Sequence, residues 1–173
     1  GALAPHCDGT RLALAGDSAG ANLVLGAMLG LREASLPQPA TACLFYGCYA
    51  PIFDTPSHEA NGGGDYLLTT DMMRWYWSNF LGSLTADDAP AACAPLFADL
   101  KHLPPLYLNA AGLDPLLDDT MILSARLAED GVRHTLDLWP GVTHGFLRLA
   151  RELPAARAAI AAAGSHLKLF FDE

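Results

Sequence analysis

A serine, an aspartate and a histidine each follow a separate apolar run of this chain. Ser18 lies in the stretch Gly-Asp-Ser-Ala-Gly (16–20), Asp114 follows the run 106–111, and His144 follows the run 135–139. A serine hydroxyl is a weak nucleophile until a base removes its proton, and the imidazole that does so needs an acid on its second nitrogen. These residue types in this order therefore predict a Ser-His-Asp triad with Ser18 as the nucleophile.

The surroundings of Ser18 are typical of a nucleophile elbow, a tight turn between a strand and a helix. An apolar run (11–15) precedes it and a helix-like segment (21–31) follows it. In this context the serine takes up a strained backbone conformation that points its hydroxyl out of the sheet. Glycine at positions 16 and 20 lets the strand and the helix come close, because a Cβ there would collide across the turn. The alternative is a glycine-rich turn with an idle serine.

Asp114 and His144 are 30 residues apart, which leaves room for one helix and one strand between them. The order serine, aspartate, histidine is that of α/β-hydrolases. Asp114 precedes a proline, so its alternative role is only to cap a helix. Asp118 and Asp119 are other candidates for the acid, but they lie one turn into the predicted helix, which favours a solvated or supporting role.

Further polar residues are weighed against the same pattern. The backbone N–H of Ala19, directly after Ser18, can serve as one donor of an oxyanion hole, and Asp17 is expected to orient the turn. The other histidines have no strand end before them, so we expect them on the surface or in loops. They are His6, His58, His102, His134 and His166.

The elements that must position these residues alternate along the chain. Strands are predicted over 11–15, 41–46, 106–111 and 135–139, the last as an edge strand. Helices are predicted over 18–34, 71–81 with Thr70 as the N-cap, 116–129 and 154–171. This alternation predicts a parallel sheet of about four strands flanked by helices. In such open sheets the chemistry lies at the carboxyl ends of the strands.

Segment 50–82 interrupts this alternation. Residues 50–65 are polar and irregular and are expected to form a mobile loop, and residues 66–80 form an aromatic stretch that is more typical of core than of a pocket wall. The helix over 18–34 is apolar on nearly every face, which indicates that it is covered on more than one side.

Composition limits the classes of protein and partner. The 173 residues are 51% apolar and 17% charged, so we expect a single domain over 1–173 with a substantial core. A net charge of −9 argues against nucleic acid and anionic membranes as partners. No apolar run has the length of a membrane span, which favours a cytoplasmic protein. The four cysteines lack a CxxC pair, so free thiols are expected and no metal.

Three stretches in order resemble the carboxyl-terminal half of one family. They are Gly-Asp-Ser-Ala-Gly (16–20), Gly-Leu-Asp-Pro-Leu-Leu-Asp-Asp (112–119) and Pro-Gly-Val-Thr-His-Gly-Phe (140–146). They are similar to the hormone-sensitive-lipase-like α/β-hydrolases, the bacterial carboxylesterases and acetyl-hydrolases, over about residues 10–147. The resemblance implies Ser18 as nucleophile, Asp114 as acid, His144 as base and Ala19 N–H as oxyanion donor. It also implies small-molecule esters of short to medium acyl chains as substrates, and no cofactor.

The chain departs from this family at two places. Ala21 stands where the family usually carries a second glycine, a small change that the elbow should tolerate. The family's His-Gly-Gly-Gly loop, which supplies most of the oxyanion hole, does not occur in the 173 residues, and neither do the strands before it. A partial α/β-hydrolase fold that is weakly active or inactive on esters is therefore expected.

Two alternatives to an esterase remain open at this point. One is a non-catalytic assembly or ligand-binding module, in which the open edge of the first strand pairs with a second copy, as a homodimer, or with a separate amino-terminal piece. The other is a peptidase or amidase, because the same triad order serves those reactions.

Overall fold

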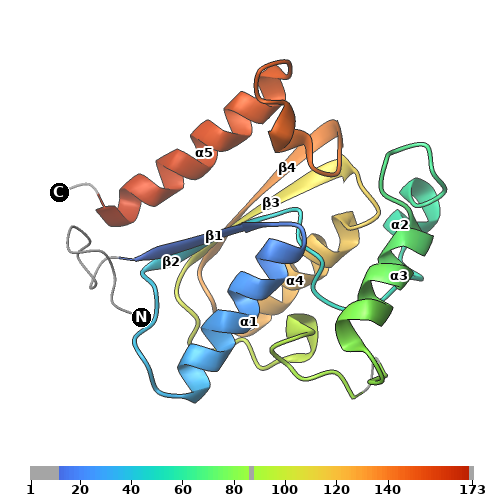
Figure 1. Ribbon diagram of the computed structural model, residues 1–173. Coiled ribbons are helices and arrows are strands. Elements are labelled where there is room, and N and C mark those ends of the chain that lie inside the picture. Colours follow the sequence, from blue (N-terminus) through green and yellow to red (C-terminus); the bar gives the residue numbers. More distant parts are fainter. Residues whose placement is uncertain (1–11, 86–87, 172–173) are drawn as a thin grey trace.

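Four parallel strands form one sheet, with each strand next to its neighbour in sequence (Figure 1). The computed structural model describes residues 12–85 and 88–171. The strands are β1 (Ala13–Asp17), β2 (Thr41–Phe45), β3 (Leu106–Leu113) and β4 (His134–Thr143). Ala42 of β2 lies opposite Leu106 of β3, which in turn lies opposite His134 of β4. The predicted parallel sheet of about four strands is confirmed, with β4 at one edge as expected.

Helices cover both faces of the sheet. α1 (Ala19–Glu33) and α4 (Leu117–Glu129) pack on one face, and α5 (Pro154–Phe171) crosses the other (Figure 1). The short α2 (Pro56–Asn61) and the longer α3 (Thr70–Leu81) stand beyond the carboxyl ends of the strands. Two 3₁₀ turns, η1 (Pro95–Phe97) and η2 (Phe146–Leu149), complete the described elements. None of the described helices is long and apolar enough to cross a membrane.

The main core lies between the sheet and the α1 and α4 layer. Leu25 and Leu29 of α1 and Leu123 of α4 are fully buried against Leu44 and Leu108 of the sheet. The opposite face is filled by aromatic residues and by the alanines of α5. The expectation that α1 is covered on more than one side is only partly right, because Leu23 leaves 58% of its surface exposed near the start of the helix.

The two strands that lead to Asp114 and His144 are longer than the sequence predicted. β3 runs to Leu113 through a local irregularity after Ala111, and β4 continues through Pro140 and Gly141 to Thr143. A proline is tolerated there because β4 is an edge strand, whose outward N–H groups need no partner in the sheet. The extension places Asp114 and His144 directly after the ends of adjacent strands.

Segment 50–82 contains a helix that the sequence did not predict. α2 lies within the supposedly irregular stretch 50–65, with the Thr55 side chain accepting from the His58 N–H and Pro56 in the first turn. The N-cap of α3 is Thr69, not Thr70, because the Thr69 hydroxyl accepts from Met72 N at 3.0 Å. Thr70 instead bonds to His58 of α2, with 2.9 Å between its Oγ1 and His58 Nδ1.

Two histidines expected on the surface or in loops are buried. His58 is 4% exposed, and His166 of α5 is 8% exposed, with its Nε2 2.8 Å from Thr41 Oγ1. Burial lowers the pKa of both imidazoles. Apolar neighbours such as Tyr107 explain the burial of His166, which anchors α5 to the sheet. His134 is half-buried, His102 is exposed, and His6 lies outside the described residues.

Candidate active site

The turn between β1 and α1 holds Ser18 in a strained conformation. Its φ of 55° and ψ of −122° place a non-glycine residue in a region that L-residues rarely adopt. The Ser18 N–H donates to Phe45 O at 2.9 Å, and the Ser18 carbonyl accepts from Ala21 N at 3.0 Å. Because these bonds hold the backbone on both sides of the turn, the hydroxyl points away from the sheet rather than capping α1.

The structure brings Ser18, His144 and Asp114 into one hydrogen-bonded chain. His144 Nε2 lies 2.9 Å from Ser18 Oγ, and His144 Nδ1 lies 2.7 Å from Asp114 Oδ2. In the tautomer with its proton on Nδ1, the imidazole donates to the carboxylate and accepts the hydroxyl proton of Ser18. The arrangement therefore allows the imidazole to act as the base that removes the Ser18 proton.

Asp114 is fully buried, and each of its oxygens is satisfied. Oδ2 faces His144, and Oδ1 accepts from Leu116 N at 2.9 Å. The carboxylate thus also bonds to the backbone at the start of α4, so the capping alternative and the acid role are compatible at this position. The carbonyl of Asp114 accepts from Asn61 Nδ2 of α2 at 3.3 Å, which ties the acid's turn to segment 50–82.

Tyr46 supports the ring of His144, and sequence reasoning missed it. Its ring lies edge-on to the imidazole with 5.1 Å between centroids, and it packs on Phe146 at 5.7 Å. Tyr46 is 1% exposed and has a positive φ of 37°, which is uncommon for a residue other than glycine. The signal that could have indicated it is an aromatic residue at the carboxyl end of the second strand, beside the predicted nucleophile.

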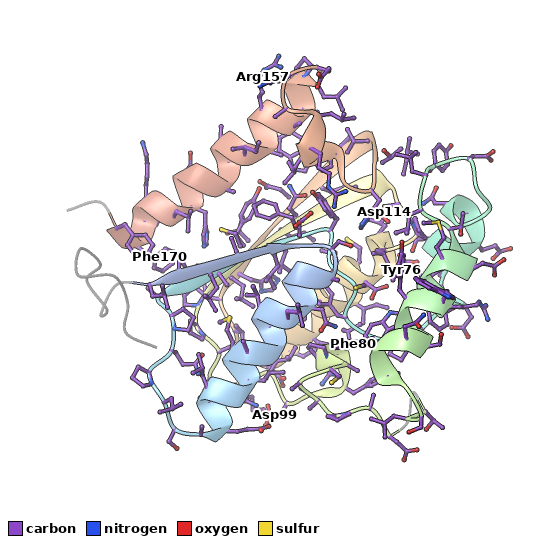
Figure 2. The ribbon with its side chains drawn as sticks, in the orientation of Figure 1. Tyr76, Phe80, Asp99, Asp114, Arg157 and Phe170 are labelled. Carbon is purple, nitrogen blue, oxygen red and sulfur yellow. The ribbon has the colours of Figure 1, made fainter. Side chains whose placement is uncertain are left out.

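A pocket of about 640 Å³ opens beside Ser18 and His144. One wall is the aromatic face of α3, and Asn22 and Leu23 of α1 line the opposite side. Figure 2 shows Tyr76 and Phe80 on α3 and Asp114 at the end of the sheet nearest α2 and α3. The aromatic stretch is therefore both core and pocket wall, since Met73 and Trp77 are buried while Tyr76 and Phe80 are about half exposed.

Two other sequence-predicted residues lie near the pocket. Ala19 lines it and begins α1, so its N–H belongs to the first turn, where backbone donors have no partner within the helix. Asp17 Oδ2 lies 3.7 Å from Nη2 of Arg148, which lines the pocket, and both side chains are about half exposed or more. Such an exposed ion pair contributes little to stability, so Asp17 affects the turn mainly by its place at the end of β1.

Asp119 is not solvated, although a solvated or a supporting role was expected. It is 2% exposed, and its Oδ1 accepts from Tyr49 N at 2.8 Å. Burial raises the pKa of its carboxyl to about 7, and the backbone donors Tyr49 and Ala50 partly oppose this shift. The nearby Asp114 and Asp118 carboxylates raise the Asp119 pKa further.

Asp118 takes a different partner, because its Oδ2 accepts from Ser57 N of α2 at 2.8 Å.

The burial of Asp119 predicts a pH-dependent stability that an amide would not show. The carboxyl of Asp119 ionises near pH 7 in the folded chain and near pH 4 in the unfolded chain, so the unfolded state binds fewer protons between these values and stability falls as pH rises through them. The effect of Asp119→Asn on the free energy of unfolding should therefore differ between the two pH values. It should be more favourable at pH 8 than at pH 5 by about 2–3 kcal/mol. Urea unfolding of both chains at both pH values measures this difference, and an equal effect at pH 5 and pH 8 would contradict the prediction.

Comparison with known proteins agrees with this architecture. The model of a family described as having the alpha/beta hydrolase fold matches residues 2–148. The chain belongs to the alpha/beta-hydrolase family. Within the family it is similar to an acetyl-hydrolase of Streptomyces hygroscopicus, with 32% identity over 170 residues that cover 96% of this chain and 55% of the relative.

Solved structures of bacterial esterases resemble this alpha/beta-hydrolase closely. An esterase of the bacterial hormone-sensitive lipase family superposes with a TM-score of 0.88 at 31% identity, covering 94% of this chain and 54% of that one. A thermostable esterase from Pseudomonas putida superposes with a TM-score of 0.89 at 32% identity, covering 96% and 53% respectively. The chain thus spans about half the length of the relatives it matches.

Proposed function

We propose that this alpha/beta-hydrolase chain carries the nucleophile, base and acid of a serine carboxylester hydrolase. The observation that carries the proposal is the continuous hydrogen-bonded chain from Ser18 Oγ through His144 to the buried Asp114. Resemblance to proteins named as esterases and as an acetyl-hydrolase supports the ester as the bond that is cleaved.

The geometry supports a two-step acyl transfer. Ser18 Oγ attacks the ester carbon while its proton passes to His144 Nε2, and Asp114 stabilises the imidazolium that forms. The tetrahedral intermediate collapses when His144 returns the proton to the leaving alcohol, which leaves an acyl group on Ser18. Water, deprotonated by the same imidazole, then attacks the acyl carbon, the bond from that carbon to Ser18 Oγ breaks, and His144 returns the proton to Ser18 as the carboxylic acid leaves. The Ala19 N–H is one donor for the oxyanion.

The pocket favours uncharged acyl or alcohol groups of modest size. Its walls are mostly apolar and aromatic, with Met72, Tyr76 and Phe80 on one side, and its volume of about 640 Å³ is that of a site for a small molecule. A carboxylate or phosphate group would lose its hydration against these walls. We therefore propose esters of short to medium acyl chains as substrates, and no cofactor.

A series of p-nitrophenyl esters tests the proposal. The expected result is turnover of the acetate and butyrate esters with kcat/KM at least about tenfold above that of the palmitate ester, because the similar protein from Streptomyces hygroscopicus is named as an acetyl-hydrolase. Ser18→Ala, assayed beside the parent chain, measures the background. Equal rates for the parent chain and Ser18→Ala would refute a Ser18-dependent esterase, and a higher rate on p-nitroanilide substrates than on esters would favour an amidase.

The rate of the 173-residue chain by itself is expected to be low. The described residues offer the Ala19 N–H beside Ser18, whereas acyl transfer usually needs two or more donors, each of which contributes about 10²–10³-fold in kcat. A preparation without Ser18-dependent turnover that behaves as a dimer would favour the assembly alternative. In that alternative the outer edge of β1, which has no strand partner among residues 12–85 and 88–171, pairs with a second copy.

A further inference from the structure

One peptide unit beneath the pocket is bound at both of its polar ends by buried side chains. The Cys48–Tyr49 peptide accepts through Cys48 O from Asn22 Nδ2 at 2.8 Å and donates through Tyr49 N to Asp119 Oδ1 at 2.8 Å. Asn22 is 3% exposed and Asp119 is 2% exposed, so water competes little for either bond. Bonds at the two ends of one peptide strengthen each other, because each increases the peptide's polarisation.

The two side chains come from the helices next to the reacting residues. Asn22 lies one turn after Ser18 in α1, and Asp119 lies in the first turn of α4, five residues after Asp114. The same Asn22 amide also donates to Cys93 O at 2.9 Å, which fixes its orientation. The path from α1 to α4 therefore consists of Asn22, one peptide and Asp119.

Cys48 places this path at the substrate site. Asn22 and Cys48 both line the pocket beside Ser18 and His144. The loop that carries the peptide begins at Tyr46, whose ring supports His144, and Tyr46 N donates to Asn109 O at 2.7 Å. A shift of the Cys48–Tyr49 peptide would thus move the support of the base together with the floor of the pocket.

We propose that Asp119 is a positioning residue that, through the Cys48–Tyr49 peptide and Asn22, sets the distance between the Ser18 hydroxyl and the His144–Asp114 pair. The inference rests on the proposed esterase function. Its reason is that the in-line geometry of Ser18, His144 and Asp114 depends on two separate helices and one loop, and a misplacement of about 1 Å can cost 10²-fold in rate. Among the described residues Asp119 forms no hydrogen bond to Ser18, His144 or Asp114, and its Oδ1 bonds to Tyr49 N, so this bond acts on the reaction through the loop. The charge of Asp119 also acts on the nearby Asp114, and Asp119→Asn removes that charge while keeping the bond.

Three substitutions distinguish a positioning role of Asp119 from an effect of its charge and from a loss of the folded state. Asp119→Asn keeps an oxygen that accepts from Tyr49 N, Asp119→Ala removes it, and Asn22→Ala removes the bond at the other end of the same peptide. Glu129→Gln is the matched control, because it removes one negative charge from an exposed position at the end of α4. Each chain is checked by circular dichroism and urea unfolding before it is assayed.

The expected kinetic result is a loss in kcat with KM nearly unchanged. Asp119→Ala should lower kcat on p-nitrophenyl acetate by about 10- to 100-fold, whereas Asp119→Asn should stay within about threefold of the parent, as should Glu129→Gln. The double substitution Asn22→Ala with Asp119→Ala should lose little more than the larger single loss, because both act on one peptide. Three results would overturn the proposal. A folded Asp119→Ala chain could have the parental kcat, or Asp119→Ala and Asp119→Asn could lose kcat equally. The kcat losses of Asn22→Ala and Asp119→Ala could also multiply fully in the double variant.

A spectroscopic measurement keeps this test separate from that of the proposed function. In the parent chain the His144 Nδ1–H, hydrogen-bonded to Asp114, should give a downfield proton resonance that is absent from His144→Ala. Asp119→Ala should broaden or shift this resonance, and Asp119→Asn should retain it. If the parent chain lacks Ser18-dependent turnover, the esterase proposal fails while this resonance still decides on positioning: an unchanged signal in Asp119→Ala would overturn it.

Discussion

Ser18→Ala is expected to reduce the turnover of p-nitrophenyl acetate by this chain to the background rate, and adding His144→Ala should lower it little further. The hydroxyl and the imidazole are 2.9 Å apart and act as one unit, because without the nucleophile the base has no proton to remove. Their losses should therefore not multiply. Initial rates of p-nitrophenol release from both single variants and the double variant measure this non-additivity.

Matched controls for this experiment come from the same chain. Ser83→Ala and His102→Ala replace an exposed serine and an exposed histidine outside the pocket and should keep the parental rate. Asp114→Asn should remove most of the Ser18-dependent turnover, because an amide facing His144 Nδ1 favours the wrong tautomer of the imidazole. Losses that multiply between Ser18→Ala and His144→Ala would show that the two residues act in separate steps.

Gly16→Ala is expected to destabilise the folded chain by distorting the turn that holds Ser18. A Cβ at Gly16 would overlap the Gly20 carbonyl and come within 2.7 Å of Ala21 N. Both are backbone atoms of the elbow, so they cannot move aside as a flexible side chain would. Overpacking of this kind costs about 1–3 kcal/mol and occasionally more, and here it would also displace Ser18 from His144.

Gly30→Ala is the matched control for Gly16→Ala. It adds the same methyl group within α1, but at a position where no atom outside the local helix backbone lies within 4 Å. It should therefore stabilise the chain by about 0.5–1 kcal/mol, since alanine loses less conformational entropy in a helix than glycine does. Urea unfolding of the two variants beside the parent gives both values. A Gly16→Ala chain as stable as Gly30→Ala would show that the turn can open without cost.

Local patterns in the sequence were enough to predict the architecture. The apolar runs 11–15 and 41–46 alternate with helical segments, and this alternation by itself indicates a parallel sheet with its chemistry at the strand ends. The positions predicted for Ser18, Asp114 and His144 follow from the same reasoning, because a residue that directly follows a strand lies at the carboxyl end of that strand. These inferences need only contacts between neighbours in sequence.

The errors concern segments whose structure depends on distant partners. The stretch that contains α2 was predicted to be irregular. α2 is held by distant partners, because the Ser57 hydroxyl donates to Pro115 O at 2.7 Å and accepts from Asp118 N, both remote in sequence. Thr69 rather than Thr70 caps α3, because the Thr70 hydroxyl bonds to His58, which is close in space. β4 continues through Pro140 because the strand lies at the edge of the sheet. In the first two cases a tertiary contact outweighs the local preference, and in the third the position of the strand at the edge of the sheet does.

The sequence by itself thus determined the order of the elements, the strained turn at Ser18 and the three candidate residues at the strand ends, because each depends on short-range sterics and periodicity. Only the tertiary structure decided that Tyr46 supports His144, that Asp119 is buried against Tyr49 N, and that Asn22 reaches the same peptide from α1. Those contacts join residues 26 to 98 positions apart, and which of many buried polar groups meet at such separations depends on the packing of the whole sheet and its helices.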